Sequence, residues 1–193
     1  MTLLPTFLQS FRRRRRASLT AWALLLLVVS GLSACISPHQ TDIFTALDTK
    51  GFVTNQAEVV AAADWKEAFI IEIQIRQNEF NPAIIRLFQG EPYILIVENR
   101  DQIPHILAST EFFKTTAIRK VLTEKEEISG ANLIGLHLSP GEIKEIHFVP
   151  VLDGWYDFEG SHGGPAVYLG DRYFAPWSHG ARRGMVGAFI VEP

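Results

Sequence analysis

Residues 154–193, at the C-terminal end, constrain the fold of this chain more than any other stretch. Residues 155–158 (WYDF) and 186–191 (VGAFIV) are rich in the aromatic and β-branched residues that favour strands. The connection between them is rich in Gly and Pro and contains three metal-ligand types: His162, His179 and Met185. Imidazole binds copper in either oxidation state, and a thioether suits Cu(I). The pattern therefore indicates a copper pocket on a loop between two strands.

This ending resembles that of the cupredoxins, the blue copper proteins such as plastocyanin and azurin. In that family a Gly-x-Tyr strand leads to a ligand Cys, a His, and a Met within a Gly-Met-x-Gly run. Residues 154–156 (Gly-Trp-Tyr) match the start of that pattern, and residues 184–187 (Gly-Met-Val-Gly) match its end. The Cys does not match, because its place, four residues after Tyr156, is held by Gly160. The resemblance therefore implies a copper site without a thiolate.

The first 34 residues have the pattern of a secretory signal. An Arg block at 12–16 precedes a short apolar run at 21–29, and Leu-Ser-Ala-Cys follows at 32–35. This ending resembles a bacterial lipobox, which implies that Cys35 is acylated and becomes the first residue of the mature protein. Ile36 replaces the Asp that typically retains such lipoproteins in the inner membrane, so the resemblance implies the outer membrane. The alternative is an N-terminal anchor helix.

The composition of the mature chain argues against nucleic-acid binding. Five of the 18 basic residues and none of the 21 acidic residues lie in the signal, which leaves 13 basic residues and a net charge of −8. The remaining 159 of 193 residues suffice for one domain with a substantial core. Cys35 is the only cysteine, so we expect neither a disulfide nor a thiolate ligand in the domain.

Strand patterns begin near Trp65. Residues 69–76 alternate apolar and polar side chains, 80–88 form an extended stretch interrupted by Pro82, and 93–97 form a third strand. Residues 56–64 are compatible with a short helix. The sequence therefore predicts a lipidated tether over 35–64 and a folded domain over 65–193.

The second half of the domain predicts further strands. Residues 111–131 are the least strand-like and indicate a short helix or a long loop. Residues 133–138 and 143–149 predict a hairpin around Ser-Pro-Gly-Glu at 139–142. Seven or eight short strands separated by turns predict an all-β Greek-key sandwich. This agrees with the resemblance, which extends over residues 68–192 and implies a cupredoxin-like domain with one short helix or loop excursion.

The resemblance assigns copper ligands in both halves of the domain. His105 follows Asn99 and a short loop, where the family has its first ligand, and His179 and Met185 fall at its later ligands. His162 lies two residues after the missing Cys, and the fourth ligand is left open between His162 and Glu159. Strand alternation points the Glu159 side chain outwards, and His162 could instead cap the Gly-rich turn. A lone His at the position of His105 would otherwise be a hydrogen-bonded structural residue.

The remaining histidines and the late insertion are expected to have other roles. His39 lies in the tether, and strand alternation places His137 and His147 on the polar surface. Residues 163–178 form an insertion relative to the family that includes several aromatic residues. These rings either pack over the end of the sandwich or form a docking surface beside the metal.

Together these patterns predict a binding protein rather than an enzyme, since no hydrolytic, nucleotide-binding or Cys-x-x-Cys motif occurs. We expect a non-blue copper site of His105, His179 and Met185, with His162 as a candidate fourth ligand, for copper storage, delivery or resistance in the envelope. Its partners would be the membrane, through the lipid, and an envelope copper or redox protein. Two alternatives stay open: electron transfer through an atypical copper centre, and a metal-free scaffold acting as an interaction module.

Overall fold

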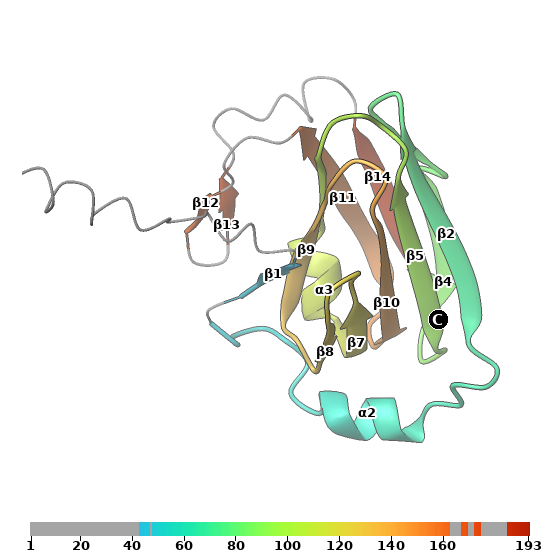
Figure 1. Cartoon of the computed structure of the whole chain (residues 1–193). Helices are drawn as coiled ribbons and strands as arrows, with labels where there is room; N and C mark the ends of the chain where they lie inside the picture. The colour runs from blue at the N-terminus through green and yellow to red at the C-terminus, as the bar shows by residue number, and fades with distance from the viewer. Residues whose placement is uncertain (1–42, 47, 163–166, 170–171, 175–184) are drawn as a thin grey trace, which may run out of the picture. The chain divides into compact units, whose positions relative to one another are not determined.

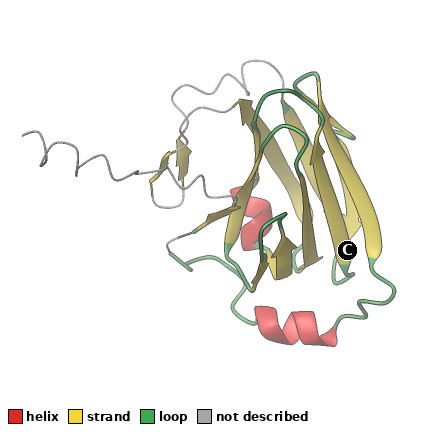
Figure 2. Ribbon diagram, in the orientation of Figure 1, coloured by secondary structure: helices red, strands yellow, loops and turns green. Residues whose placement is uncertain are grey.

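The computed structural model describes residues 43–46, 48–162, 167–169, 172–174 and 185–193 (Figure 1). All of these described residues belong to one compact unit. Strands make up most of its described part, and two short helices accompany them (Figure 2). These are α2 (Gln56–Ala62) and α3 (Thr110–Lys114). Neither described helix has the length or the apolar run that a bilayer span requires.

Two six-stranded sheets build the domain. In sheet 1 the strands lie in the order β1-β9-β6-β11-β14-β4, and in sheet 2 the order is β3-β2-β5-β10-β7-β8. The bounds in sheet 1 are β1 Ile43–Thr45, β9 Leu133–Leu138, β6 His105–Ala108, β11 Gly154–His162, β14 Val186–Glu192 and β4 Ile84–Phe88. The bounds in sheet 2 are β3 Glu79–Asn81, β2 Phe69–Arg76, β5 Tyr93–Asn99, β10 Ile143–Pro150, β7 Thr116–Leu122 and β8 Glu127–Ser129. A separate two-stranded ribbon comprises β12 (Val167–Leu169) and β13 (Arg172–Phe174).

Consecutive strands repeatedly change sheet, so the chain forms a Greek-key β-sandwich, as the sequence predicted. The predicted alternation in β2 is confirmed, because Ile73 and Ile75 are fully buried whereas Glu72 and Arg76 are exposed. The sheets are mostly antiparallel, and each contains one parallel pair, β2 with β5 and β14 with β4.

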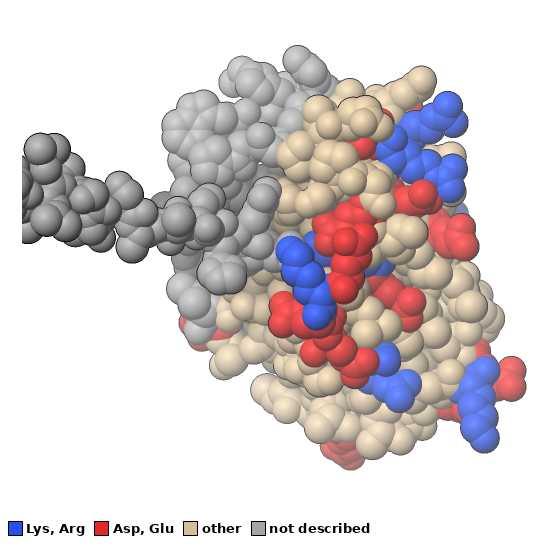
Figure 3. Space-filling view, viewed as in Figure 1, with Lys and Arg blue, Asp and Glu red and all other residues tan. Residues whose placement is uncertain are grey.

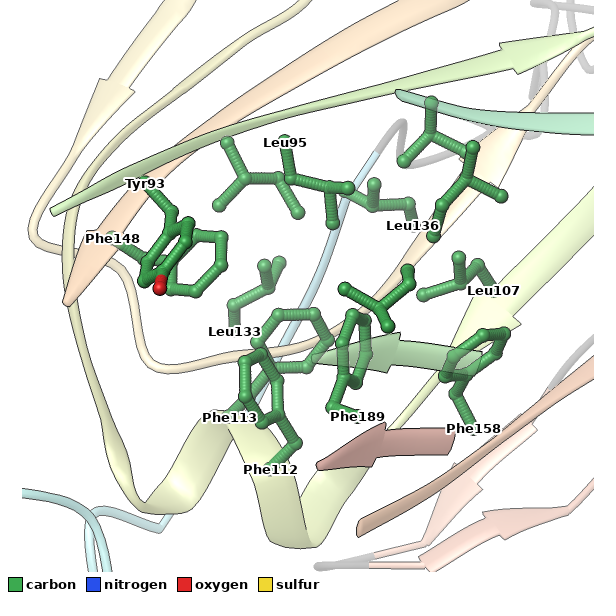
Figure 4. Packing of buried hydrophobic residues seen from close by; sticks show 14 of the residues in the cluster. Tyr93, Leu95, Leu107, Phe112, Phe113, Leu133, Leu136, Phe148, Phe158 and Phe189 are labelled. Carbon is green, nitrogen blue, oxygen red and sulfur yellow. The ribbon is translucent and has the colours of Figure 1, made fainter. Parts of the chain in front are cut away.

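A hydrophobic core fills the space between the two sheets (Figure 4). The rings of Phe112 and Phe189 stack with their centroids 4.1 Å apart, and Phe158 contacts Phe189 at 4.7 Å. Phe112 comes from α3, so this short helix contributes aromatic side chains to the core. Aromatic pairs in favourable geometry add roughly 0.5–1.5 kcal/mol each beyond the area they bury.

The predicted hairpin between residues 133–138 and 143–149 is wrong. These segments are the strands β9 and β10, but they lie in different sheets, so the turn between them crosses the sandwich. The side chain of Asn99 holds the turn from β5, since its Nδ2 lies 3.0 Å from the carbonyl oxygen of Leu138 and 3.1 Å from that of Ser139. A non-local contact therefore decides a connection that the local turn signal assigned to a hairpin.

Residues 111–131 also differ from the prediction. A short helix, one of the two expected possibilities, is present as α3, but β7 and β8 follow it, and β7 pairs with β10. Two basic residues of β7 interrupt the apolar pattern from which a strand could have been predicted. Arg119 lies over the ring of Trp65 at 4.6 Å, and Lys120 pairs with Glu127 at 3.1 Å.

The folded unit begins before Trp65, within the segment predicted to be a tether. Strand β1 pairs with β9, with Ile43 opposite Leu136. The helix predicted near residue 56 is present as α2 and is fastened to the sandwich by Gln56. Its side-chain oxygen accepts the Ile118 N–H at 3.2 Å, and its nitrogen donates to Asn132 at 3.1 Å. Because none of its residues is buried, the apolar pattern gave little signal that this helix docks.

The charged side chains on the drawn face are mixed in sign. Lys and Arg side chains stand among Asp and Glu side chains there and do not gather into a single basic patch (Figure 3).

Candidate metal centre

Three strand ends meet at one end of sheet 1. Strand β6 begins at His105, β11 ends at His162 and β14 begins at Val186, and the three strands are neighbours in the sheet. In the antiparallel register His162 lies opposite His105, and Glu159 lies opposite Val186. The fold therefore brings the backbones of His105, His162 and the residue before β14, Met185, to the same end of the sandwich.

Met185 fills the place above Gly160, where the family resemblance expects the Cys side chain. The Gly160 N–H donates to the Met185 carbonyl at 2.8 Å, and Met185 is fully buried within the core cluster. A Cβ added at Gly160 would overlap the Met185 methyl group and would lie 2.8 Å from Cζ of Phe80. The volume that a cysteine needs is therefore occupied by a thioether methyl and an aromatic ring.

The second glycine of the Gly-Met-Val-Gly run has a packing role. A Cβ at Gly187 would overlap the ring of Phe158 and would lie 2.5 Å from the backbone oxygen of Ala83. Ala83 also accepts the N–H of Ala188 at 2.8 Å, which draws β14 close to the segment before β4. Gly187 therefore lets this strand pass over an aromatic ring immediately beside Met185.

His105 is fully buried and bonded to a carboxylate. Its Nε2 lies 2.9 Å from Oδ2 of Asp101, whose side chain is 15% exposed. Burial lowers the pKa of His105 below its ordinary value of 6.5, and the hydrogen bond and charge of Asp101 offset only part of that effect. The imidazole is therefore neutral at pH 7, as a metal ligand must be.

Asp101 is held by backbone groups as well as by the imidazole. Burial alone raises the pKa of Asp101. The N–H groups of Asn78 and Gln77 and the His105 ring nevertheless hold that pKa below its ordinary value of 3.8. Asp101 is therefore ionised near neutral pH and provides a negative charge beside His105.

Asn99 shapes the loop that leads to His105. Its Nδ2 donates to the carbonyl oxygen of Ile103 at 2.9 Å, in addition to the β9–β10 turn, and its Oδ1 accepts the Asp101 N–H at 3.0 Å. Asn99 itself is fully buried. One amide side chain thus fixes both ends of the loop between β5 and β6, and thereby the position of the His105 backbone.

The structure describes only some of the predicted ligands. His105 and Met185 are both fully buried, and the backbone of His162 is placed by its register in β11. His179 and Cys35 lie outside the described residues, as do the side chain of His162 and much of the 163–178 insertion. Among the side chains that the structure describes, no group of three or more His, Cys, Asp and Glu is arranged to hold a metal.

The prediction that His137 and His147 are surface residues is wrong. His137 is 5% exposed, and the other five residues of β9 are buried as well. Strand β9 lies between β1 and β6 in sheet 1. His147 is 8% exposed, with its Nε2 bonded to Glu145 and the ring of Trp65 at a centroid distance of 6.0 Å. Glu159 is exposed, as its alternation in β11 predicted.

Sequence reasoning missed Asp101 and the buried pair of Lys144 and Glu142. Asp101 lies four residues before His105, but a loop has no fixed geometry from which to infer that contact. Lys144 is fully buried, and its Nζ lies 3.1 Å from Glu142 and also bonds the His137 carbonyl. A lysine that follows Ile143 in a strand alternation reads as solvent-facing, so its burial left no signal in the sequence.

Comparisons with known proteins give structural neighbours only. No family model matches the chain, and no curated protein matches it. One solved neighbour is the metal-binding domain of the Cu(I)-exporting P-type ATPase CopA of Streptococcus pneumoniae D39 with Cu(I). It is 20% identical over 68% of this chain and 93% of that chain, with a TM-score of 0.36. Another is auracyanin from the photosynthetic bacterium Roseiflexus castenholzii, 14% identical over 65% of this chain and 98% of that chain, with a TM-score of 0.41.

These neighbours are cupredoxins. A third neighbour is a multicopper oxidase from Pseudomonas thermotolerans, with 17% identity and a TM-score of 0.43. The match covers 67% of this chain but only 31% of the oxidase.

Proposed function

We propose that this chain is an envelope lipoprotein whose cupredoxin-like domain binds copper at a non-blue His/Met site, for copper storage, delivery or resistance. The observation that carries the proposal is the meeting of His105, His162 and Met185 backbones at one end of sheet 1. His179 would complete the ligand set. Acylation of Cys35 would anchor the domain to the membrane, with an envelope copper or redox protein as partner.

The chemistry of the donor set fits copper. His105 is neutral at pH 7, because its burial disfavours the charged form, and it is oriented by a carboxylate, as metal-binding histidines commonly are. Met185 supplies a soft thioether, which favours Cu(I) over harder ions. A site with these donors would hold and release copper without changing a substrate, which agrees with a binding role.

The absence of a thiolate sets the expected spectrum. The strong colour of a blue copper centre comes from a copper–thiolate bond. Gly160 stands at the expected Cys position and the space above it is filled by Met185 and Phe80. We therefore expect bound Cu(II) to absorb only weakly in the visible range.

A metal-free scaffold is the second candidate, and one specific observation favours it. Met185 is fully buried among hydrophobic residues of the core, where a methionine stabilises the fold without binding anything. On this alternative the end of the sandwich near Gly160 is packed with apolar side chains and holds no copper. The domain would then act as an interaction module.

Competitive titration of the full chain with Cu(I) and Cu(II) separates the two candidates. If the proposal holds, His105→Ala and His179→Ala should each weaken binding far more than His147→Ala. His147 is a matched control because it is also buried and also bonded to a carboxylate, but it lies in sheet 2. Equal affinity in all three variants, or no binding by the wild type, would leave the metal-free scaffold. An intense blue complex would contradict both candidates.

A further inference from the structure

The carboxylate of Asp101 lies between His105 and the turn that joins β2 to β3. Oδ1 accepts the N–H of Gln77 at 2.7 Å, and Oδ2 accepts the N–H of Asn78 at 2.9 Å. Oδ2 also lies 2.9 Å from Nε2 of His105. One side chain from the β5–β6 loop therefore links a turn of sheet 2 to a candidate ligand of sheet 1.

The hydrogen bonds of the Asp101 carboxylate determine which nitrogen of the His105 ring carries the proton. Gln77 and Asn78 both have positive φ, of 57° and 62°, and both present their N–H groups to the carboxylate. An ionised carboxylate can only accept hydrogen bonds, so His105 must donate from Nε2. A neutral imidazole carries one proton, and its lone pair is therefore on Nδ1.

The geometry points to Asp101 as the residue that positions His105 for copper, by holding the ring in the Nε2–H form with Nδ1 as the coordinating atom. This inference rests on the proposed copper function and adds the residue that sets the ligand's tautomer and ring orientation. Carboxylate partners of this kind orient metal-binding histidines, and their loss typically costs about 10–100-fold in metal affinity. The β2–β3 turn becomes part of the site, because it fixes the carboxylate in turn.

The first test uses the wild-type chain and needs no variant. Nitrogen NMR of the full-length, metal-free protein labelled at histidine should show His105 protonated at Nε2 and unprotonated at Nδ1. Addition of Cu(I), which is diamagnetic, should shift the Nδ1 resonance and retain the Nε2 proton. Protonation at Nδ1, or loss of the Nε2 proton on Cu(I) addition, would overturn the inference.

The second test compares two carboxylate deletions. Asp101→Ala should weaken Cu(I) binding about 10–100-fold. It should also remove the acceptor of the Nε2 proton of His105, so that the signal of this proton is lost through exchange with solvent. Glu145→Ala is the matched control, because it removes the carboxylate from the His147 pair in sheet 2 and should leave Cu(I) affinity unchanged.

The outcomes distinguish the inference from the function on which it rests. Equal Cu(I) affinity of Asp101→Ala and wild type would overturn the positioning role and leave the copper function standing. Equal weakening by both deletions would show a general effect on stability and would likewise overturn it. Absence of Cu(I) binding by the wild type would overturn the function and the inference together.

Discussion

Gly160 offers the sharpest test of how Met185 is used. Gly160 lies in a strand with a backbone conformation that any residue adopts, so Gly160→Ala carries no backbone strain. The added Cβ would overlap the Met185 methyl group and lie 2.8 Å from Cζ of Phe80. The ring of Phe80 is itself packed edge-on against Phe158, with centroids 5.0 Å apart, and cannot turn away freely.

The expected cost follows from two opposing effects. Overpacking a core by a carbon atom costs roughly 1–3 kcal/mol, and two close contacts place this site in the upper part of that range. Replacing a strand glycine restores roughly 0.5–1 kcal/mol, because alanine loses less backbone entropy on folding. Gly160→Ala should therefore lower the free energy of unfolding by about 1–2 kcal/mol.

Truncation of Met185 should remove the loss of stability that Gly160→Ala causes. Met185→Ala alone should destabilise the fold by about 2–5 kcal/mol, as loss of a buried methionine does. In that background, Gly160→Ala should be neutral or slightly stabilising, since the new methyl group and the Phe80 ring can use the vacated space. The two changes should therefore couple by roughly 1–2 kcal/mol, with the double variant more stable than additivity predicts.

Urea unfolding of the metal-free wild type, both single variants and the double variant measures this coupling. Gly187→Ala is the matched control. Its Cβ would meet the backbone oxygen of Ala83 and the Phe158 ring, neither of which Met185→Ala removes. The loss of stability caused by Gly187→Ala should therefore be the same in the Met185→Ala variant as in the wild type. Additivity of Gly160→Ala and Met185→Ala within about 0.5 kcal/mol would refute the claim that Met185 fills the place of the missing side chain.

Two further predictions concern the anchor and pH. Cys35→Ser should leave the domain folded but release it from membranes or leave it unprocessed, since stable anchoring here depends on acyl chains; a processed, lipid-free chain that stays membrane-bound in fractionation would contradict this. Burial lowers the pKa of His105, so the unfolded state binds more protons below pH 6.5, and the metal-free protein should lose stability as the pH falls below that value. Urea midpoints should be flat just above pH 6.5 and decline below it, with a smaller decline for His105→Gln; an equal decline would show that other groups cause it.

Strand β2 could be predicted from the sequence because one of its faces is buried and the other faces solvent. In β2 the buried Ile73 and Ile75 alternate with polar residues, so the letters alone reveal the strand. In β7 the charged residues find partners in Trp65 and Glu127, which lie far away in sequence or across a turn. A pattern of charges carries no information on such partners, and β7 was therefore missed.

The β9–β10 connection likewise depends on contacts that the local sequence does not reveal. Ser-Pro-Gly-Glu at 139–142 is a sound local turn, and the turn is present, with the Glu142 N–H donating to the Ser139 oxygen at 3.0 Å. Whether the strands on either side pair is decided elsewhere. Asn99 donates to the oxygens of Leu138 and Ser139, and β10 takes β5 and β7 as its neighbours. Local sequence therefore predicted the turn but could not predict the sheet.

At the candidate site, the sequence indicated candidate ligands but not the residues that position them. His105 follows an Asn-containing loop, and the structure buries it at a strand end, yet its orientation depends on Asp101 and on two backbone N–H groups of a distant turn. The same holds for Met185. Its position in the chain indicates a ligand, but its packing over Gly160 follows only from the register of β11 and β14.

The packing role of Met185 and its proposed role as a copper ligand fall to different atoms of one side chain. The methyl group occupies the volume that an added Cβ at Gly160 would need, which explains why a glycine is tolerated inside a packed core. The sulfur is bonded to that methyl and keeps its lone pairs whether or not the methyl is buried. Burial of the methyl group therefore does not by itself exclude the sulfur as the proposed ligand atom. A cysteine at position 160 would require Met185 to move, so a Gly160→Cys chain should not gain a thiolate while Met185 keeps its present place.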